Sequence, residues 1–239
     1  MQVWDLALTA VPVIAAGGAG LSASVRRPGR RVTSGLQHFA AGVVIAAAAL
    51  ELLPEVVRER GVVPLVGFAL GVAVMFGMRA LAGLVEERSR AASGSKLPLG
   101  LVGATAVDFL IDGLVLGAGF TAGGHTGVLL AIAIAIEYVF VGLSLAGAMD
   151  GESSTLLMVG VPLLLSLLTV GGALLGVWLL AGVSEVMLAG VLAFGAVAFM
   201  YLATEELLVE AHARGETAVG STAFYVGFLA ILVIEQALR

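Results

Sequence analysis

Eight apolar runs separated by short polar breaks are the feature that most limits how this chain can fold. A helix needs about 20 consecutive apolar residues to cross the hydrocarbon layer of a membrane. Mean hydropathy is +1.10 and only 12% of the residues are charged, values far outside the range of a soluble domain. The backbone inside a bilayer must satisfy its own hydrogen bonds, and this favours helices. We therefore predict an all-α integral membrane protein with eight transmembrane helices, at approximately residues 4–25, 36–57, 62–85, 97–119, 126–149, 155–181, 185–209 and 218–237.

The polar breaks predict the domain organisation and the orientation. None is long enough for a separate domain, so residues 1–239 are expected to form a single transmembrane domain, whose first run is retained as a helix. Arg79 lies within a run and is expected to snorkel toward the interface. Of the other eleven Lys and Arg residues, eight share one side: Arg26, Arg27, Arg30, Arg31, Arg88, Arg90, Lys96 and Arg214. The positive-inside rule then predicts a multi-pass protein of the cell membrane with both termini outside.

Three acidic residues interrupt the middle of two runs. Asp108 and Asp112 lie one helical turn apart in the fourth run, so both face the same neighbour, and Glu137 stands alone in the fifth. A charged acid at the bilayer centre costs about 2.5–3.5 kcal/mol. Such acids would repel one another unless a cation or protons held them together, which predicts an ion site. The alternative is that hydrogen bonds of these acids only hold helices together.

The available ligand types restrict the ion. The chain has no cysteine, so oxygen atoms or the three histidines must bind any metal. Carboxylates suit hard or borderline divalent cations. Further acids and histidines near the ends of the second and seventh runs could form an entrance and an exit for cations, or could simply be solvated: Glu51, Glu55, Glu206, Glu210, His212 and His38. His125 is expected in a glycine-rich loop and shows no partner pattern.

A weak internal repeat links the second and seventh runs. Phe39 precedes Glu51-Leu-Leu-Pro-Glu55 by twelve residues, and Phe194 precedes Glu206-Leu-Leu-Val-Glu210 by twelve. In the predicted topology these runs cross the membrane in opposite directions, and inverted repeats are common in transporters. Chance similarity within so apolar a chain is the alternative explanation.

These motifs resemble those of the ZIP family of divalent metal transporters over nearly the whole chain. Asp108-Phe-Leu-Ile-Asp-Gly-Leu-Val-Leu-Gly117 is similar to the fourth-helix motif His-Asn-x-Pro-Glu-Gly, and Glu137-Tyr-Val-Phe-Val-Gly142 to the fifth-helix motif His-Glu-x-Pro-Glu-Gly. The stretch from His38 to Glu55 resembles the second helix of the family, and the stretch from Phe199 to His212 resembles the seventh. Both motif prolines are absent.

The resemblance implies a ZIP-like bundle with an inverted repeat of helices 1–3 and 6–8 around helices 4 and 5. It also implies a homodimer that moves a divalent metal ion, such as zinc, iron or manganese, into the cytoplasm. One metal position is implied at Asp108, Asp112 and Glu137. The second metal position of the family is expected to be lost, because Phe109, Tyr138 and Thr169 replace its ligands. Val141 stands in place of a further carboxylate ligand of the first position.

Two other functions remain open. A non-transporting or sensory relative would use the acid cluster to bind a structural ion or protons. An intramembrane hydrolase could share a proton between paired aspartates, but Asp108 and Asp112 lie on one helix, and no Gly-x-Gly-Asp, His-Glu-x-x-His or Gly-x-Ser-x-Gly pattern occurs. We therefore expect no enzymatic activity and no organic cofactor. The few, mostly membrane-flanking basic residues give no support to nucleic-acid binding.

Overall fold

The computed structural model describes residues 3–25, 29–92, 99–148, 155–213 and 218–238, and in these ranges every regular element is helical. Eight helical segments of the described chain are long and apolar enough to cross a membrane. The prediction of an all-α protein with eight such segments is therefore confirmed. The segments extend over Ala7–Val25, Arg30–Arg58, Val62–Leu84, Gly100–Ala122, His125–Ala146, Thr155–Leu180, Glu185–Ala213 and Gly220–Leu238.

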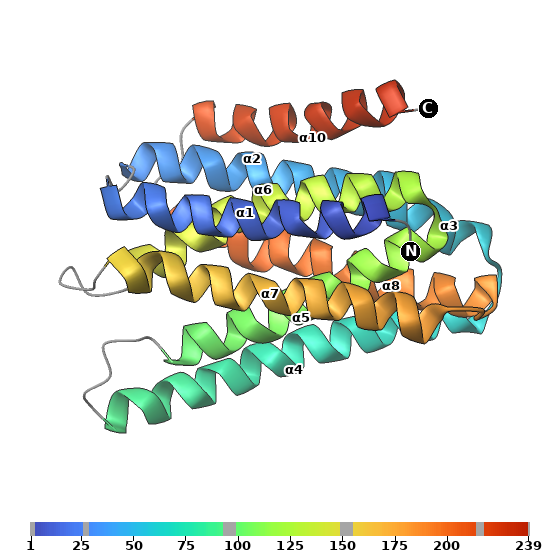
Figure 1. The fold of residues 1–239 in the computed structure, drawn as a ribbon, viewed down its shortest axis with the longest axis horizontal. Helices are drawn as coiled ribbons and strands as arrows, with labels where there is room; N and C mark the ends of the chain where they lie inside the picture. Colours follow the sequence, from blue (N-terminus) through green and yellow to red (C-terminus); the bar gives the residue numbers. More distant parts are fainter. Residues whose placement is uncertain (1–2, 26–28, 93–98, 149–154, 214–217, 239) are drawn as a thin grey trace.

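The second and seventh segments are each composed of three consecutive elements, and the other six are single helices (Figure 1). The elements are α1 (Val3–Val25), α2 (Arg30–Ala47), η1 (Ala48–Leu52), α3 (Leu53–Arg58), α4 (Val62–Ala92), α5 (Leu99–Ala122), α6 (Gly124–Ala148), α7 (Thr155–Leu180), α8 (Glu185–Tyr201), η2 (Leu202–Leu207), α9 (Leu208–Ala213) and α10 (Ala218–Leu238). Both ends of the described chain lie at one end of the bundle, here called the terminus end, together with α3 and the start of α6. The opposite end is called the far end.

The helices pack in two groups. In the α5–α6 group, α5 and α1 pack on α7, α1 packs on α6, and α5 packs on α6. In the α2–α8 group, α2 packs along α10 and α4 along α8, and η1 and α3 lie against α8. Figure 1 shows α10 and α2 at one edge of the bundle and α4 at the opposite edge. The two groups meet where α2 contacts α6 and where α5 contacts α4 and α8.

Glycines allow α5 and α7 to approach closely. A Cβ atom added at Gly113 would lie 2.3 Å from the backbone oxygen of Thr169, and one added at Gly172 would lie 2.5 Å from that of Leu110. No side chain fits at either place, so the small residues bring the two backbones together as in other membrane bundles. This contact fixes the position of α5, which carries two of the three predicted site acids.

Two π-helical turns interrupt the second and seventh membrane segments. In the first, η1 ends two residues before Pro54, which has no N–H to donate to the carbonyl of Leu50 and would clash with it in a regular α-helix. In the second, η2, Thr204 donates its hydroxyl to the carbonyl of Met200 at 2.8 Å. Turns of this kind frequently mark functional sites. Here η1 carries Glu51, and η2 carries Glu205 and Glu206.

Candidate metal centre

The structure brings Asp108, Asp112 and Glu137 together between α5 and α6. Each offers a carboxylate oxygen, and the three oxygens lie within 4.8 Å of one another. Asp108 and Asp112 share a face of α5 because they are separated by one helical turn. Glu137 reaches them from the middle of α6 and is completely buried, Asp112 is 2% exposed, and Asp108 is half-buried. We call these three residues the central cluster.

Three of the six carboxylate oxygens of the central cluster lack protein donors in the described part of the chain. Both carboxylate oxygens of Glu137 and Oδ2 of Asp112 are buried and accept no hydrogen bond from the described part of the chain. Buried polar atoms are nearly always hydrogen-bonded, and a buried charge needs a counter-charge. Three carboxylates at this spacing are therefore suited to share protons or to bind a cation.

An aromatic stack occupies the space beside the central cluster. The rings of Phe109 and Tyr138 are stacked with centroids 3.7 Å apart, and both side chains are fully buried. The Tyr138 hydroxyl shares a hydrogen bond of 2.5 Å with Oγ1 of Thr169 on α7. Tyr138 and Thr169 thus satisfy each other, and the stack supplies no carboxylate.

A cavity of about 470 Å³ extends from the central cluster toward the far end of the bundle. It lies between α4, α5, α6 and the η2–α9 segment. Asp108 lines it, which explains why this acid is less buried than the other two. Glu206 and Glu210 contribute further carboxylates to its wall, and Ser144 contributes a hydroxyl. The cavity therefore forms an acid-lined route between the cluster and one end of the molecule.

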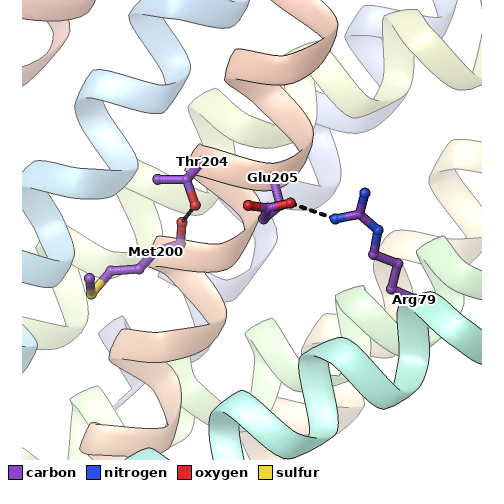
Figure 2. A network of polar contacts seen from close by, with 4 residues as sticks. All are labelled: Arg79, Met200, Thr204 and Glu205. Atoms are coloured by element: carbon purple, nitrogen blue, oxygen red, sulfur yellow. Dashed lines mark hydrogen bonds and ion pairs between the residues drawn. The ribbon is translucent and has the colours of Figure 1, made fainter.

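Arg79 also lines the cavity, and Glu205 neutralises it. Figure 2 shows Arg79 on α4 reaching toward Glu205 on η2, where Nη1 donates to Oε2 at 2.5 Å. The sequence predicted only that Arg79 would snorkel to the interface. Arg79 pairs with Glu205, and the neighbouring Glu206 lines the cavity.

The two histidines predicted on the pathway lie close together near the far end. The rings of His38 and His212 are 5.2 Å apart in an edge-to-face arrangement. Nδ1 of His38 lies 2.8 Å from the carbonyl of Ser34, and Nδ1 of His212 lies 2.5 Å from that of Leu208. A carbonyl only accepts, so in the neutral rings Nδ1 carries the hydrogen and Nε2 keeps its lone pair.

The remaining two pathway candidates lie toward the terminus end. Glu55 forms an ion pair of 2.8 Å with Arg58, and the cavity lining does not include it. Glu51 is 5% exposed and lies beside His125 and Glu235. The expected loop position of His125 is wrong, because the helix α6 begins at Gly124 and includes it.

Sequence reasoning missed the site that Glu51 shares with His125 and Glu235. Glu235 lies in the last apolar segment, so the rule that singled out Glu137, an acid within a membrane span, also applies to it. His125 gave no such signal, because its position in the helix and its partners depend on the tertiary structure.

No protein-family model matches the chain, and no curated protein matches it. The fold and the site define the class. The described part of the chain is all-helical, with eight segments long and apolar enough to span a membrane and a buried carboxylate cluster at the inner end of an acid-lined cavity.

Proposed function

We propose that this protein is a ZIP-like transporter that moves a divalent cation across the membrane through a single site at Asp108, Asp112 and Glu137. The observation that carries the proposal is the convergence of three carboxylates from two helices on one point at the end of a cavity. Three of their buried oxygens, Oδ2 of Asp112 and both oxygens of Glu137, have no donor in the described part of the chain. A divalent ion would supply the missing counter-charge, and oxygen ligands suit zinc, iron(II) or manganese among the borderline ions.

The arrangement of helices supports an inverted repeat of the first three and last three spans around α5 and α6. The pairing of α2 with α10 corresponds to that of α8 with α4, and the pairing of α5 with α7 to that of α6 with α1. The π-helical turns η1 and η2 fall on the two copies of the sequence repeat. Repeats of this type suit alternating access around a central site.

In this proposal the α5–α6 group moves relative to the α2–α8 group and exposes the central cluster to each side in turn. The far end faces the cytoplasm, as the distribution of basic residues predicts, and both termini lie outside. The cavity is then the cytoplasmic exit, and Glu206 and Glu210 attract the departing cation. As in the family it resembles, the protein works in the cell membrane as a homodimer.

The test is metal uptake into proteoliposomes. Asp108→Asn, Asp112→Asn and Glu137→Gln should each lower uptake by more than about tenfold, because even loss of an outer-shell partner weakens metal sites by about 10–100-fold. Glu185→Gln, which removes an exposed carboxylate at the start of α8, is the matched control and should keep wild-type uptake. Unchanged uptake in all three cluster variants would refute the mechanism.

A non-transporting metal sensor is the second candidate. The observation that favours it is the buried Phe109–Tyr138 stack beside the cluster, which supplies no carboxylate for a second metal position. Calorimetric binding of zinc or manganese together with an absence of flux in the same reconstituted preparation would establish the sensor and exclude the transporter.

A further inference from the structure

A second cluster of metal-ligating side chains lies at the terminus end. It consists of Glu51 on η1, His125 in the first turn of α6 and Glu235 near the end of α10. One potential ligand atom from each residue lies within 4.8 Å of the other two. These residues come from three separate segments of the chain, so only the tertiary fold brings them together. We call them the terminus-end cluster.

The geometry places the imidazole between the two carboxylates. Nε2 of His125 lies 3.0 Å from Oε2 of Glu235, and Nδ1 lies 3.7 Å from Oε2 of Glu51. The glutamate side chains are 4% exposed, whereas that of His125 is 35% exposed. The two acids are therefore enclosed by protein, and the histidine forms the solvent-facing side through which an ion could enter.

A second observation points to a ligand. Although His125 is partly exposed, its Nε2 atom is buried and faces Oε2 of Glu235 at 3.0 Å without the geometry of a hydrogen bond. When both carboxylates are ionised, the two carboxylates and the imidazole carry a net negative charge even if the histidine is protonated. Burying such a charge is costly unless a cation balances it.

We propose that Glu51, His125 and Glu235 bind a divalent cation of the zinc type. Imidazole with carboxylates suits zinc, iron(II) and manganese, and zinc binds such ligands at about 2.0–2.2 Å. Ligands of one ion therefore lie at most about 4 Å apart, and small side-chain rotations would bring this cluster to that spacing. One ring nitrogen of His125 would bind the ion while the other donates to a carboxylate, as is usual for metal-bound histidines.

The position of the terminus-end cluster gives this ion a role distinct from that of the central cluster. His125 belongs to the α5–α6 group, whereas Glu51 and Glu235 belong to the α2–α8 group. An ion bound to all three residues would clamp the two groups together at the terminus end, while the cavity extends to the far end. Occupancy would thus favour the conformation described here.

Zinc binding to a background that lacks the central cluster tests the proposal. The background is Asp108→Asn, Asp112→Asn and Glu137→Gln in one chain, purified in detergent without a polyhistidine tag. Calorimetry should detect one zinc ion per chain. His125→Gln and, separately, Glu235→Gln should each weaken its binding at least about tenfold. Glu185→Gln, an exposed acid at the same end, should leave it unchanged. The site is overturned if the background binds no zinc, or if both variants bind zinc as tightly as the background does.

The clamp is tested by distance measurement in the same background. The chain has no cysteine, so Leu179→Cys on α7 and Leu238→Cys on α10 introduce two unique, exposed labelling positions at the terminus end, one in each group. Zinc should narrow the distribution of spin-label distances, and His125→Gln should abolish this effect. A distribution that zinc leaves unchanged overturns the clamp. Uptake by the three single variants of the central cluster tests the transporter separately, because they retain Glu51, His125 and Glu235.

Discussion

At the scale of single residues, neighbouring acids have different surroundings. Glu205 and Glu206 are adjacent in η2, yet Glu205 pairs with Arg79 while Glu206 lines the cavity (Figure 2). In the central cluster, Asp108 faces the cavity and Glu137 is fully enclosed. A cation moving from the far end to the cluster would therefore pass the carboxylates of Glu210 and Glu206 before it reaches Asp108.

This difference in surroundings predicts a loss of uptake for one of two neighbouring substitutions and little change for the other. Glu206→Gln should lower initial uptake at limiting metal concentration by about tenfold, because fixed charge in a narrow route raises the local cation concentration by at least that factor. Glu205→Gln removes the same charge from an exposed ion pair and should change uptake little. The measurement is metal flux into proteoliposomes at several ionic strengths. Equal losses in both variants would contradict the assignment of Glu206 to the route.

The hydrogen bond between Tyr138 and Thr169 holds the aromatic stack in place. Tyr138→Phe leaves the Thr169 hydroxyl without this partner and should destabilise the protein by about 1–3 kcal/mol. Thr169→Val should cost a similar amount. The double variant should lose less than the sum, because both groups disappear together. Thermal unfolding in detergent measures the cycle, and strictly additive losses would show that the two hydroxyls do not depend on each other.

At the scale of elements, backbone contact between α5 and α7 positions two of the three central acids. Gly172 lies directly against the backbone of α5, whereas a Cβ atom added at the adjacent Gly171 would have no atom within 4 Å. The two glycines are one residue apart on the same helix but face different surroundings. Their substitution therefore separates close packing from helix propensity.

Gly172→Ala should destabilise the protein by about 1–3 kcal/mol, because the added methyl group would overpack the contact with Leu110. Gly171→Ala should be neutral or stabilise the helix by about 0.5–1 kcal/mol, since alanine loses less backbone entropy than glycine. Thermal unfolding of the two variants side by side decides the matter. If both variants unfold at the wild-type temperature, α5 and α7 do not pack as described.

At the scale of the whole molecule, the cavity and the terminus-end cluster lie at opposite ends of the contact between the two helix groups. The described conformation is therefore accessible at the far end and held together at the terminus end. Alternating access requires that, when the two helix groups move, the far end closes and the terminus end opens.

Thiol labelling tests which side the cavity faces. In the cysteine-free chain, Ser144→Cys would place one thiol on the cavity wall, and Ser166→Cys one on α7 in a fully buried position outside it. A membrane-impermeant reagent should modify the first from the cytoplasmic side, with protection by bound metal, and should not modify the second. Modification of Ser144→Cys from the outer side alone would reverse the proposed orientation.

Local pattern determined the features that need no partner. Apolar runs of membrane length predict helices wherever they occur, because a backbone in lipid must satisfy its own hydrogen bonds. The spacing of Asp108 and Asp112 placed both carboxylates on one helix face, since the helical repeat fixes that geometry. The identity of Glu137 as their neighbour came from its position in the middle of the next span. All of these are properties of one or two consecutive segments.

Only the tertiary structure decided the contacts between distant segments. The pairing of Arg79 with Glu205 and the meeting of Glu51, His125 and Glu235 join residues from elements far apart in the chain. No periodicity encodes such contacts, because they depend on how helices pack and on which face each presents. The reason is physical: the bilayer imposes helical spans on any sufficiently apolar sequence, whereas packing of small residues and buried charges selects one arrangement of those spans.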